Sequence, residues 1–196
     1  MSWGWSRDYV LLFMGVVGSL GCMAVLAGAP AQAAISLVAQ VLAYGALWQI
    51  GRIDGERFRI DPGWLLLLLG AGGLWQMQTV GPDAVEGLLR SMTGAGVGFL
   101  VGGVPLLVAQ ALGRRWPFFP GDVLLFAALG WLLGPWGLVW SLPVGSACAL
   151  GRHAFVQRLR GRSWLQGYVP LGPGMAIGGS LVLWAVALER AGHGLG

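Results

Sequence analysis

The sequence has few charged residues for its length and no lysine at all. Of its 196 residues, 10% are charged and 56% are hydrophobic, and the mean hydropathy is +0.71. Soluble domains carry about 25% charged residues, so this composition excludes a soluble domain. Apolar stretches of about 20 residues recur along the chain, which is the length a helix needs to cross a bilayer. We therefore expect an all-α, polytopic transmembrane bundle that forms a single integral membrane domain over residues 1–196.

Cysteine and histidine are too few and too scattered for a disulfide framework or a metal centre. Cys22 and Cys148 fall inside apolar stretches, and His153 and His193 stand alone in or near expected loops. Zinc sites need clusters of these residues at short spacing, so no metal and no cofactor are expected. The net charge of +4 comes from arginine, and no basic patch is interleaved with aromatic residues, so nucleic acid is not an expected partner.

The apolar stretches predict seven membrane spans. They run roughly over residues 9–27, 33–50, 64–80, 88–112, 123–133, 136–150 and 171–188. The fifth and sixth are short and meet at Gly134-Pro135, because proline cannot continue one helix but suits the start of the next. Residues 1–34 also resemble a secretory signal that could be cleaved after a small-residue site. A retained helix is the favoured interpretation, because the apolar run of residues 9–29 is longer than the core of a signal peptide.

Arginine placement predicts the orientation of these spans. With a cytoplasmic N-terminus, the inner side collects Arg7, Arg52, Arg57, Arg59, Arg114, Arg115, Arg152, Arg158, Arg160 and Arg162, and the outer side collects only Arg90 and Arg190. Cytoplasmic loops of membrane proteins are enriched in arginine and lysine. We therefore expect a multi-pass protein of the cell inner membrane, with its N-terminus cytoplasmic and its C-terminus outside.

Two acidic residues stand at the inner ends of apolar stretches. Asp54 follows the second span and Asp122 opens the fifth, so both are expected at the cytoplasmic face. An acid in a membrane segment costs roughly 2.5–3.5 kcal/mol on insertion scales, and such acids usually mark a pathway or an active site. The simpler alternative is that Asp122 caps its helix from the water side, because aspartate is favoured at helix starts.

Paired carboxylates offer a specific chemistry. Two of them at one water-accessible cleft cannot both ionise easily, so one keeps a proton. The pair can then activate a water as base and protonate the leaving group as acid, as in aspartic proteases. The sequence shows no catalytic arrangement of serine, cysteine and histidine residues. Asp54 and Asp122 are therefore its candidate catalytic residues.

Three segments of the chain carry recognisable motifs, namely Ile53–Pro62 (IDGERFRIDP), Phe119–Gly134 (FPGDVLLFAALGWLLG) and Val169–Gly178 (VPLGPGMAIG). In this order they resemble the first acidic element, the GxGD element with its following helix, and a late proline- and glycine-rich element of one family. That family is the type IV prepilin peptidases, which are intramembrane aspartyl proteases of the GxGD type. The separation of Asp54 and Asp122 is also close to the family's spacing. The peptidase-like core would cover about residues 33–190.

The resemblance implies an endopeptidase that cleaves the short basic leader of prepilin-like or pseudopilin-like proteins at the cytoplasmic membrane face. Its implied partners are that substrate and the lipid bilayer, in a type IV pilus or type II secretion system, and it implies no cofactor and no particular oligomeric state. The matching positions supply a catalytic pair, Asp54 and Asp122, and the substrate-binding residues Gly121, Pro170, Gly172 and Pro173.

The sequence also departs from the family pattern. Phe119 and Pro120 replace the first two positions of GxGD, Leu124 stands where the family has lysine, and Asp61-Pro62 reverses the usual order of proline and acid. The cysteine-rich domain of the longer members has no counterpart, so N-methyltransferase activity is not expected. An alternative of a different class is a catalytically weak or inactive membrane scaffold for pilus or secretion assembly. A transporter would need acids near the bilayer midplane and an internal repeat, and neither is visible.

Overall fold

The computed structural model describes residues 31–79, 84–113, 120–161, 163 and 169–193. In these residues the regular structure is α-helical, as α2 (Ala31–Arg57), α3 (Pro62–Thr79), α4 (Ala84–Ala111), α5 (Pro120–Leu159) and α6 (Leu171–His193). The expected all-α class is confirmed for this part of the chain. Three helical segments are long and apolar enough to cross a membrane, namely Ala34–Arg57, Val85–Ala111 and Pro120–Leu159.

The described part of the chain holds five helices, whereas the sequence predicted seven spans. The first expected span, residues 9–27, lies outside the described residues, and the fifth and sixth form the single element α5. α5 is nevertheless broken at Gly134, whose φ of 71° and ψ of 177° are not helical. Only glycine adopts this backbone conformation readily, and Pro135 has no N–H to continue the helical hydrogen bonds. The break predicted at Gly134-Pro135 is therefore present, and α5 folds back on itself there.

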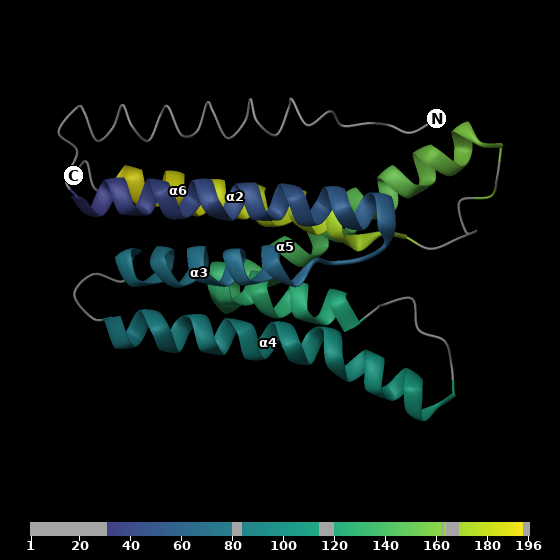
Figure 1. Ribbon diagram of the computed structural model, residues 1–196, viewed down its shortest axis with the longest axis horizontal. Coiled ribbons are helices and arrows are strands. Elements are labelled where there is room, and N and C mark those ends of the chain that lie inside the picture. Colours follow the sequence, from purple (N-terminus) through teal and green to yellow (C-terminus); the bar gives the residue numbers. More distant parts are fainter. Residues whose placement is uncertain (1–30, 80–83, 114–119, 162, 164–168, 194–196) are drawn as a thin grey trace.

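The helices lie side by side along the long axis of the molecule (Figure 1). α2 and α6 are neighbours on one side, α4 forms the opposite edge, and α3 and the first part of α5 lie between them. The end of α2, the starts of α3, α5 and α6, and the last part of α5 share one end of the bundle. We call it the Asp54 end.

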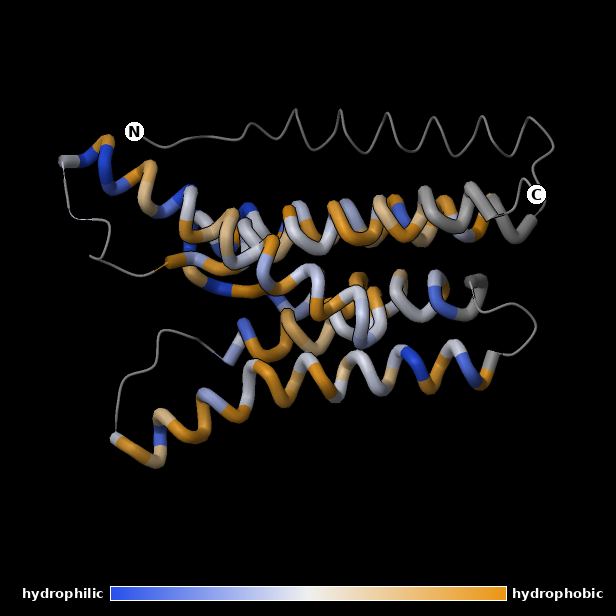
Figure 2. Tube along the Cα trace, turned by 180° about the vertical axis from the view of Figure 1, so that it is seen from behind, coloured by the Kyte–Doolittle hydropathy of each residue, from blue (hydrophilic) through white to orange (hydrophobic). Residues whose placement is uncertain are grey.

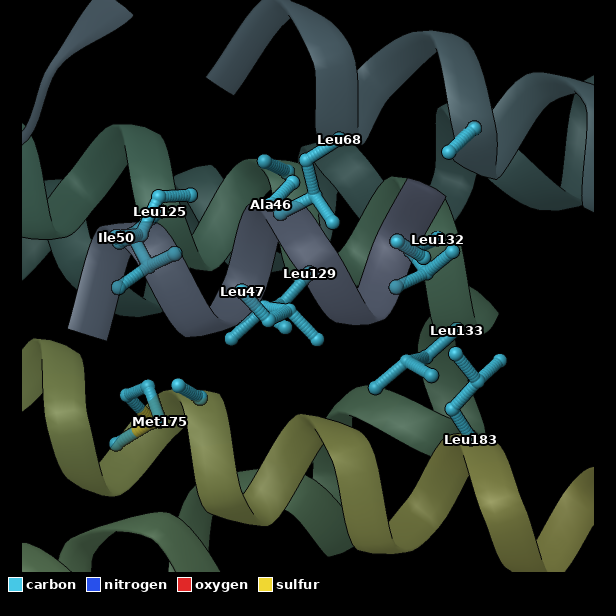
Figure 3. Close-up of a cluster of buried hydrophobic side chains, with 14 of the residues drawn as sticks. Ala46, Leu47, Ile50, Leu68, Leu125, Leu129, Leu132, Leu133, Met175 and Leu183 are labelled. Atoms are coloured by element: carbon cyan, nitrogen blue, oxygen red, sulfur yellow. The ribbon is translucent and has the colours of Figure 1, made fainter. Parts of the chain in front are cut away.

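The core is built from apolar side chains of α2, α3, α5 and α6. Figure 3 shows part of this cluster, including the fully buried side chains Leu47, Ile50, Leu68, Leu125, Leu129 and Met175. Leu47 of α2 and Leu129 of α5 approach the same point on α6. A Cβ atom added at Gly179 would lie 3.5 Å from Leu47 Cδ1 and 2.7 Å from Leu129 Cδ2. The three helices therefore meet at this level of the bundle.

α4 packs tightly on one face and is apolar on the other. A Cβ atom on Gly94 or on Gly130 would overlap the carbonyl oxygen of the other residue, so α4 and α5 touch backbone to backbone. Small residues allow such contact between helices in lipid. On the outer face Leu89, Leu100 and Leu107 are 58–64% exposed, and Figure 2 shows hydrophobic residues along much of the helix. This face is suited to contact with lipid chains.

Two side chains link α3 to α5 inside the apolar core. Gln76 Nε2 donates a 2.8 Å hydrogen bond to the carbonyl oxygen of Leu132, and Trp131 Nε1 donates a 2.7 Å hydrogen bond to that of Leu69. Leu132 lies in the last turn before the break in α5, where carbonyl groups lose their helical partners. Gln76 therefore supplies a donor that the broken helix needs.

Candidate active site

Asp54 lies within the last turn of α2, because this helix continues past the apolar stretch to Arg57. The sequence predicted that the span would end at residue 50. In this extension Arg52 and Glu56, four residues apart on the helix surface, form an ion pair with a 3.4 Å Nε–Oε1 distance, which adds a small stabilisation. Asp54 projects from the other side of this turn and is only 5% exposed. Its carboxylate is therefore part of the bundle interior.

Asp122 lies in the first turn of α5, which begins at Pro120. It too is only 5% exposed, so it is buried within the bundle. Its neighbour Gly121 packs against the linker between α2 and α3, since a Cβ atom at Gly121 would lie 3.3 Å from Ile60 Cβ. The start of α5 is thereby held beside the segment that follows Asp54.

The register of α2 against α5 places the two acids at the same level. Leu47 and Leu129 meet at Gly179, and the two helices run in opposite directions from that point (Figure 1). Asp54 comes seven residues after Leu47, and Asp122 comes seven residues before Leu129. Seven residues make about two helical turns and a rise of about 10.5 Å, so each acid returns to the face of its leucine. The two buried acids thus stand at corresponding positions on α2 and on the first part of α5.

The start of α6 also contacts Asp54. The backbone N–H of Gly172 donates a 2.8 Å hydrogen bond to Asp54 Oδ2. A Cβ atom on Gly172 would lie 2.6 Å from Asp54 Cβ and 2.7 Å from Oδ2, so the contact requires glycine. Pro173 packs beside it, with its Cγ atom 3.1 Å from the position that a Cβ atom of Gly55 would take. The first turn of α6 therefore covers Asp54.

The substrate-binding residues predicted from the sequence differ in how closely they approach Asp54 and Asp122. Gly172 bonds directly to Asp54, and Pro173 lies against the turn of α2 that holds it. Gly121 contacts Ile60, and Pro170 stands partly buried just before α6. Phe119, in the motif around Asp122, lies outside the described residues.

Arg152 is a residue of this site that the sequence reasoning did not identify. Its Nη2 and Nη1 atoms lie 3.7 and 3.9 Å from the position that a Cβ atom would take at Gly55, the residue after Asp54. It reaches the site because the break at Gly134 returns the last part of α5 to the Asp54 end. Local sequence around Arg152 carries no sign of this contact.

The arrangement offers carboxyl groups that can donate and accept protons. Within residues 31–79, 84–113, 120–161, 163 and 169–193, no group of three or more histidine, cysteine or acidic side chains could hold a metal ion. Two carboxylates can exchange protons with a water molecule between them.

Comparison of the chain with protein-family models, with curated proteins and with solved structures gives no match.

Proposed function

We propose that this protein is an intramembrane aspartyl endopeptidase of the prepilin peptidase type, with Asp54 and Asp122 as its catalytic pair. The substrate class would be the short basic leader of a prepilin-like or pseudopilin-like protein. The altered GxGD motif would be a variant that retains the acid and the glycine before it.

One observation carries the proposal, namely the burial of two carboxylates at corresponding positions on two helices of an apolar bundle. Each is 5% exposed, and each lies two turns beyond the point where Leu47 and Leu129 meet. Burying an isolated acid is unfavourable, and we propose that the two carboxyl groups share a proton, which lowers this cost. A shared proton is also what aspartyl protease chemistry needs.

The chemistry follows from the pair. The ionised carboxylate takes a proton from a water molecule, and the resulting hydroxide adds to the scissile carbonyl carbon. The protonated carboxyl group donates its proton to the amide nitrogen as the C–N bond breaks, and the first acid now holds the proton taken from water. Because the first turn of α6 covers Asp54, an extended substrate segment has to displace that turn to reach the acids.

The orientation in this proposal places the Asp54 end in the cytoplasm. Arg57, Arg152 and Arg158 are exposed at this end, as the positive-inside rule requires for a cytoplasmic side. Figure 2 shows hydrophilic residues on the last part of α5, which extends beyond the other helices. Seven spans would be reached by adding residues 9–27 and counting the two parts of α5 separately. The membrane would be the cell inner membrane.

The test is cleavage of candidate prepilins co-expressed with this protein, followed by gel shift and by N-terminal sequencing of the product. We expect Asp54→Asn and Asp122→Asn to lower the cleavage rate by about 100- to 10,000-fold, the usual effect of losing a general acid or base. Asp61→Asn is the matched control. Asp61 is exposed at the same end, and its Oδ1 atom accepts a hydrogen bond from Gly63 N, which asparagine can also accept. Equal cleavage by all four proteins would contradict the proposal.

A second function has one observation in its favour. The hydrogen bond from Gly172 N to Asp54 Oδ2 ties α6 to α2, which is a structural use of a buried acid. A scaffold that binds pilin helices would need this link between α6 and α2 but no catalytic activity. Wild-type protein that cleaves no prepilin but still co-purifies with pilin subunits would favour the scaffold.

A further inference from the structure

We propose that the Asp54 end of the bundle carries a surface that binds the headgroups of anionic phospholipids. The surface consists of exposed arginine and apolar side chains from the last part of α5 and from the linker between α2 and α3. We call it the Arg-Phe rim, and its residues are Arg57, Phe58, Arg59, Arg152, Phe155, Arg158, Leu159 and Arg160. The inference does not depend on peptidase activity, because a scaffold would present the same surface.

The last part of α5 has an apolar and basic outer face. Arg152, Phe155 and Leu159 follow one another at helical spacings of three and four residues, so they share one face of the helix. Phe155 is 60% exposed and Leu159 is 67% exposed, whereas Gln157, on the opposite face, is buried. Arg158 is exposed as well. Helices that lie at a membrane surface combine large apolar side chains with arginines in this way.

The linker after α2 repeats the same combination. Phe58 stands between two exposed arginines, Arg57 and Arg59, and is itself 47% exposed. Its φ of 50° lies in the left-handed region, where the N–H of Phe58 closes α2 by donating a 2.9 Å hydrogen bond to the carbonyl oxygen of Asp54. A bulky side chain is unfavourable in that conformation, and glycine would form the turn with less strain. A contact of the ring outside the bundle accounts for phenylalanine at this position.

The two segments lie together at the level of lipid headgroups. The guanidinium group of Arg152 lies 3.7 Å from the position that a Cβ atom would take at Gly55, three residues before Phe58. The apolar part of α2 ends at Ile50, and the seven residues from there to Arg57 rise by about 10.5 Å. Headgroup layers begin where the hydrocarbon ends and are about 5–8 Å thick, within reach of long arginine side chains. The last part of α5 leaves the bundle at an angle to the other helices (Figure 1), which keeps it near this level.

The charge of the rim selects anionic lipids. It contains five exposed arginines, whereas the exposed acids beside it, Glu56 and Asp61, already bond to Arg52 and to the N–H of Gly63. Clusters of four to eight basic residues next to a membrane helix attract anionic lipids, and guanidinium groups bind phosphate through paired hydrogen bonds. A neutral membrane would accept the apolar side chains but would leave this positive charge without a counterpart.

The test is photo-crosslinking in lipid nanodiscs that contain the full-length protein in phosphatidylcholine. A small amount of phospholipid with a photoreactive group near its headgroup is added, as phosphatidylglycerol in one sample and as phosphatidylcholine in the other. Mass spectrometry then locates the adducts along the chain. We expect adducts on the peptides of the Arg-Phe rim, with a yield about 5-fold or more higher for phosphatidylglycerol, since one arginine near a membrane surface contributes about this factor.

Substitutions of exposed side chains show whether charge and apolar contact both act. Arg158→Gln should lower the phosphatidylglycerol yield on the α5 peptide by about 5-fold, and Arg158→Lys should retain it. Phe155→Gln should lower the yield for both lipids, because it removes an apolar contact that does not depend on headgroup charge. Arg90→Gln is the matched control, because it removes an exposed arginine near the start of α4, at the opposite end of the bundle. We expect it to leave the yield on the rim unchanged.

Three outcomes would overturn the inference. The first is an equal yield on the rim from the two lipids, and the second is an Arg158→Gln protein that matches Arg90→Gln. The third is a set of lipid adducts that appears only in discs with a single copy of the protein, which would show that a second copy covers this surface. Prepilin cleavage is measured separately, so its absence would refute the peptidase and leave lipid binding by the rim intact.

Discussion

Gly172→Ala is the smallest change that should disturb the proposed site. The added Cβ atom would lie 2.6 Å from Asp54 Cβ, 2.7 Å from Oδ2 and 2.9 Å from Cγ, all far inside van der Waals contact. Either the first turn of α6 moves away or the Asp54 side chain rotates. In both cases the 2.8 Å hydrogen bond from Gly172 N to Oδ2 is lost.

The loss of stability expected for Gly172→Ala follows from three contributions. A hydrogen bond to a charged group contributes about 1.5–3 kcal/mol, and overpacking a tight site costs about 1–3 kcal/mol. Alanine has a better helix propensity than glycine, and this offsets up to about 1 kcal/mol of the lost stability. We therefore expect a net loss of about 2–4 kcal/mol, which for a chain of this size lowers the thermal midpoint by roughly 5–15 °C. A displacement of Asp54 by about 1 Å would also reduce cleavage about 100-fold.

The assay is thermal unfolding in detergent, followed by tryptophan fluorescence, together with the cleavage rate below the midpoint. Gly151→Ala is the control, because this residue lies in α5 near the same end and a Cβ atom there would meet nothing within 4 Å. We expect Gly151→Ala to leave the thermal midpoint unchanged or to raise it slightly. If Gly172→Ala behaves like Gly151→Ala in both measurements, the described contact between α6 and Asp54 is refuted.

Two further substitutions test how α5 is held in its folded-back shape. Gln76→Ala removes the donor to the Leu132 carbonyl oxygen and should lower stability by about 1–3 kcal/mol, measured as a drop in the thermal midpoint. Gly134→Ala places a side chain at φ 71° and ψ 177°, with its Cβ atom 3.0 Å from Arg90 Nε, and should cost about 1–3 kcal/mol in the same assay. Unchanged midpoints in both variants would contradict the described break.

Much of the fold could be predicted from composition, because apolar stretches of membrane length have few alternatives to the helix. The break at Gly134-Pro135 was also predictable from two residues with strong backbone preferences. The helices α2 and α5 extend beyond the predicted apolar spans, because a hydropathy pattern ends where polar residues begin, whereas a helix can continue through them. α2 continues to Arg57, where Arg52 pairs with Glu56, and α5 continues to Leu159.

Only some residues of the candidate site could be predicted from the sequence. Asp54 and Asp122 stand out because acids are rare in apolar helices, and Gly172 belongs to a recognisable proline- and glycine-rich segment. The contact of Gly172 with Asp54, and the approach of Arg152 to Gly55, depend on how α6 and the last part of α5 pack. Such contacts join residues far apart in the chain, so local pattern carries no information about them.

The central claim is that Asp54 and Asp122 form one pair at the Asp54 end of the bundle. It is tested by replacing both with cysteine, in a background where Cys22 and Cys148 are serine, and adding a short membrane-permeant reagent that joins two thiols. The control is Asp54→Cys with Leu124→Cys, because Leu124 lies two residues from Asp122 on α5 but is 52% exposed on its outer face. We expect the first pair to be joined rapidly in membranes and the control pair to react slowly. Equal rates, or faster joining of the control pair, would contradict the account.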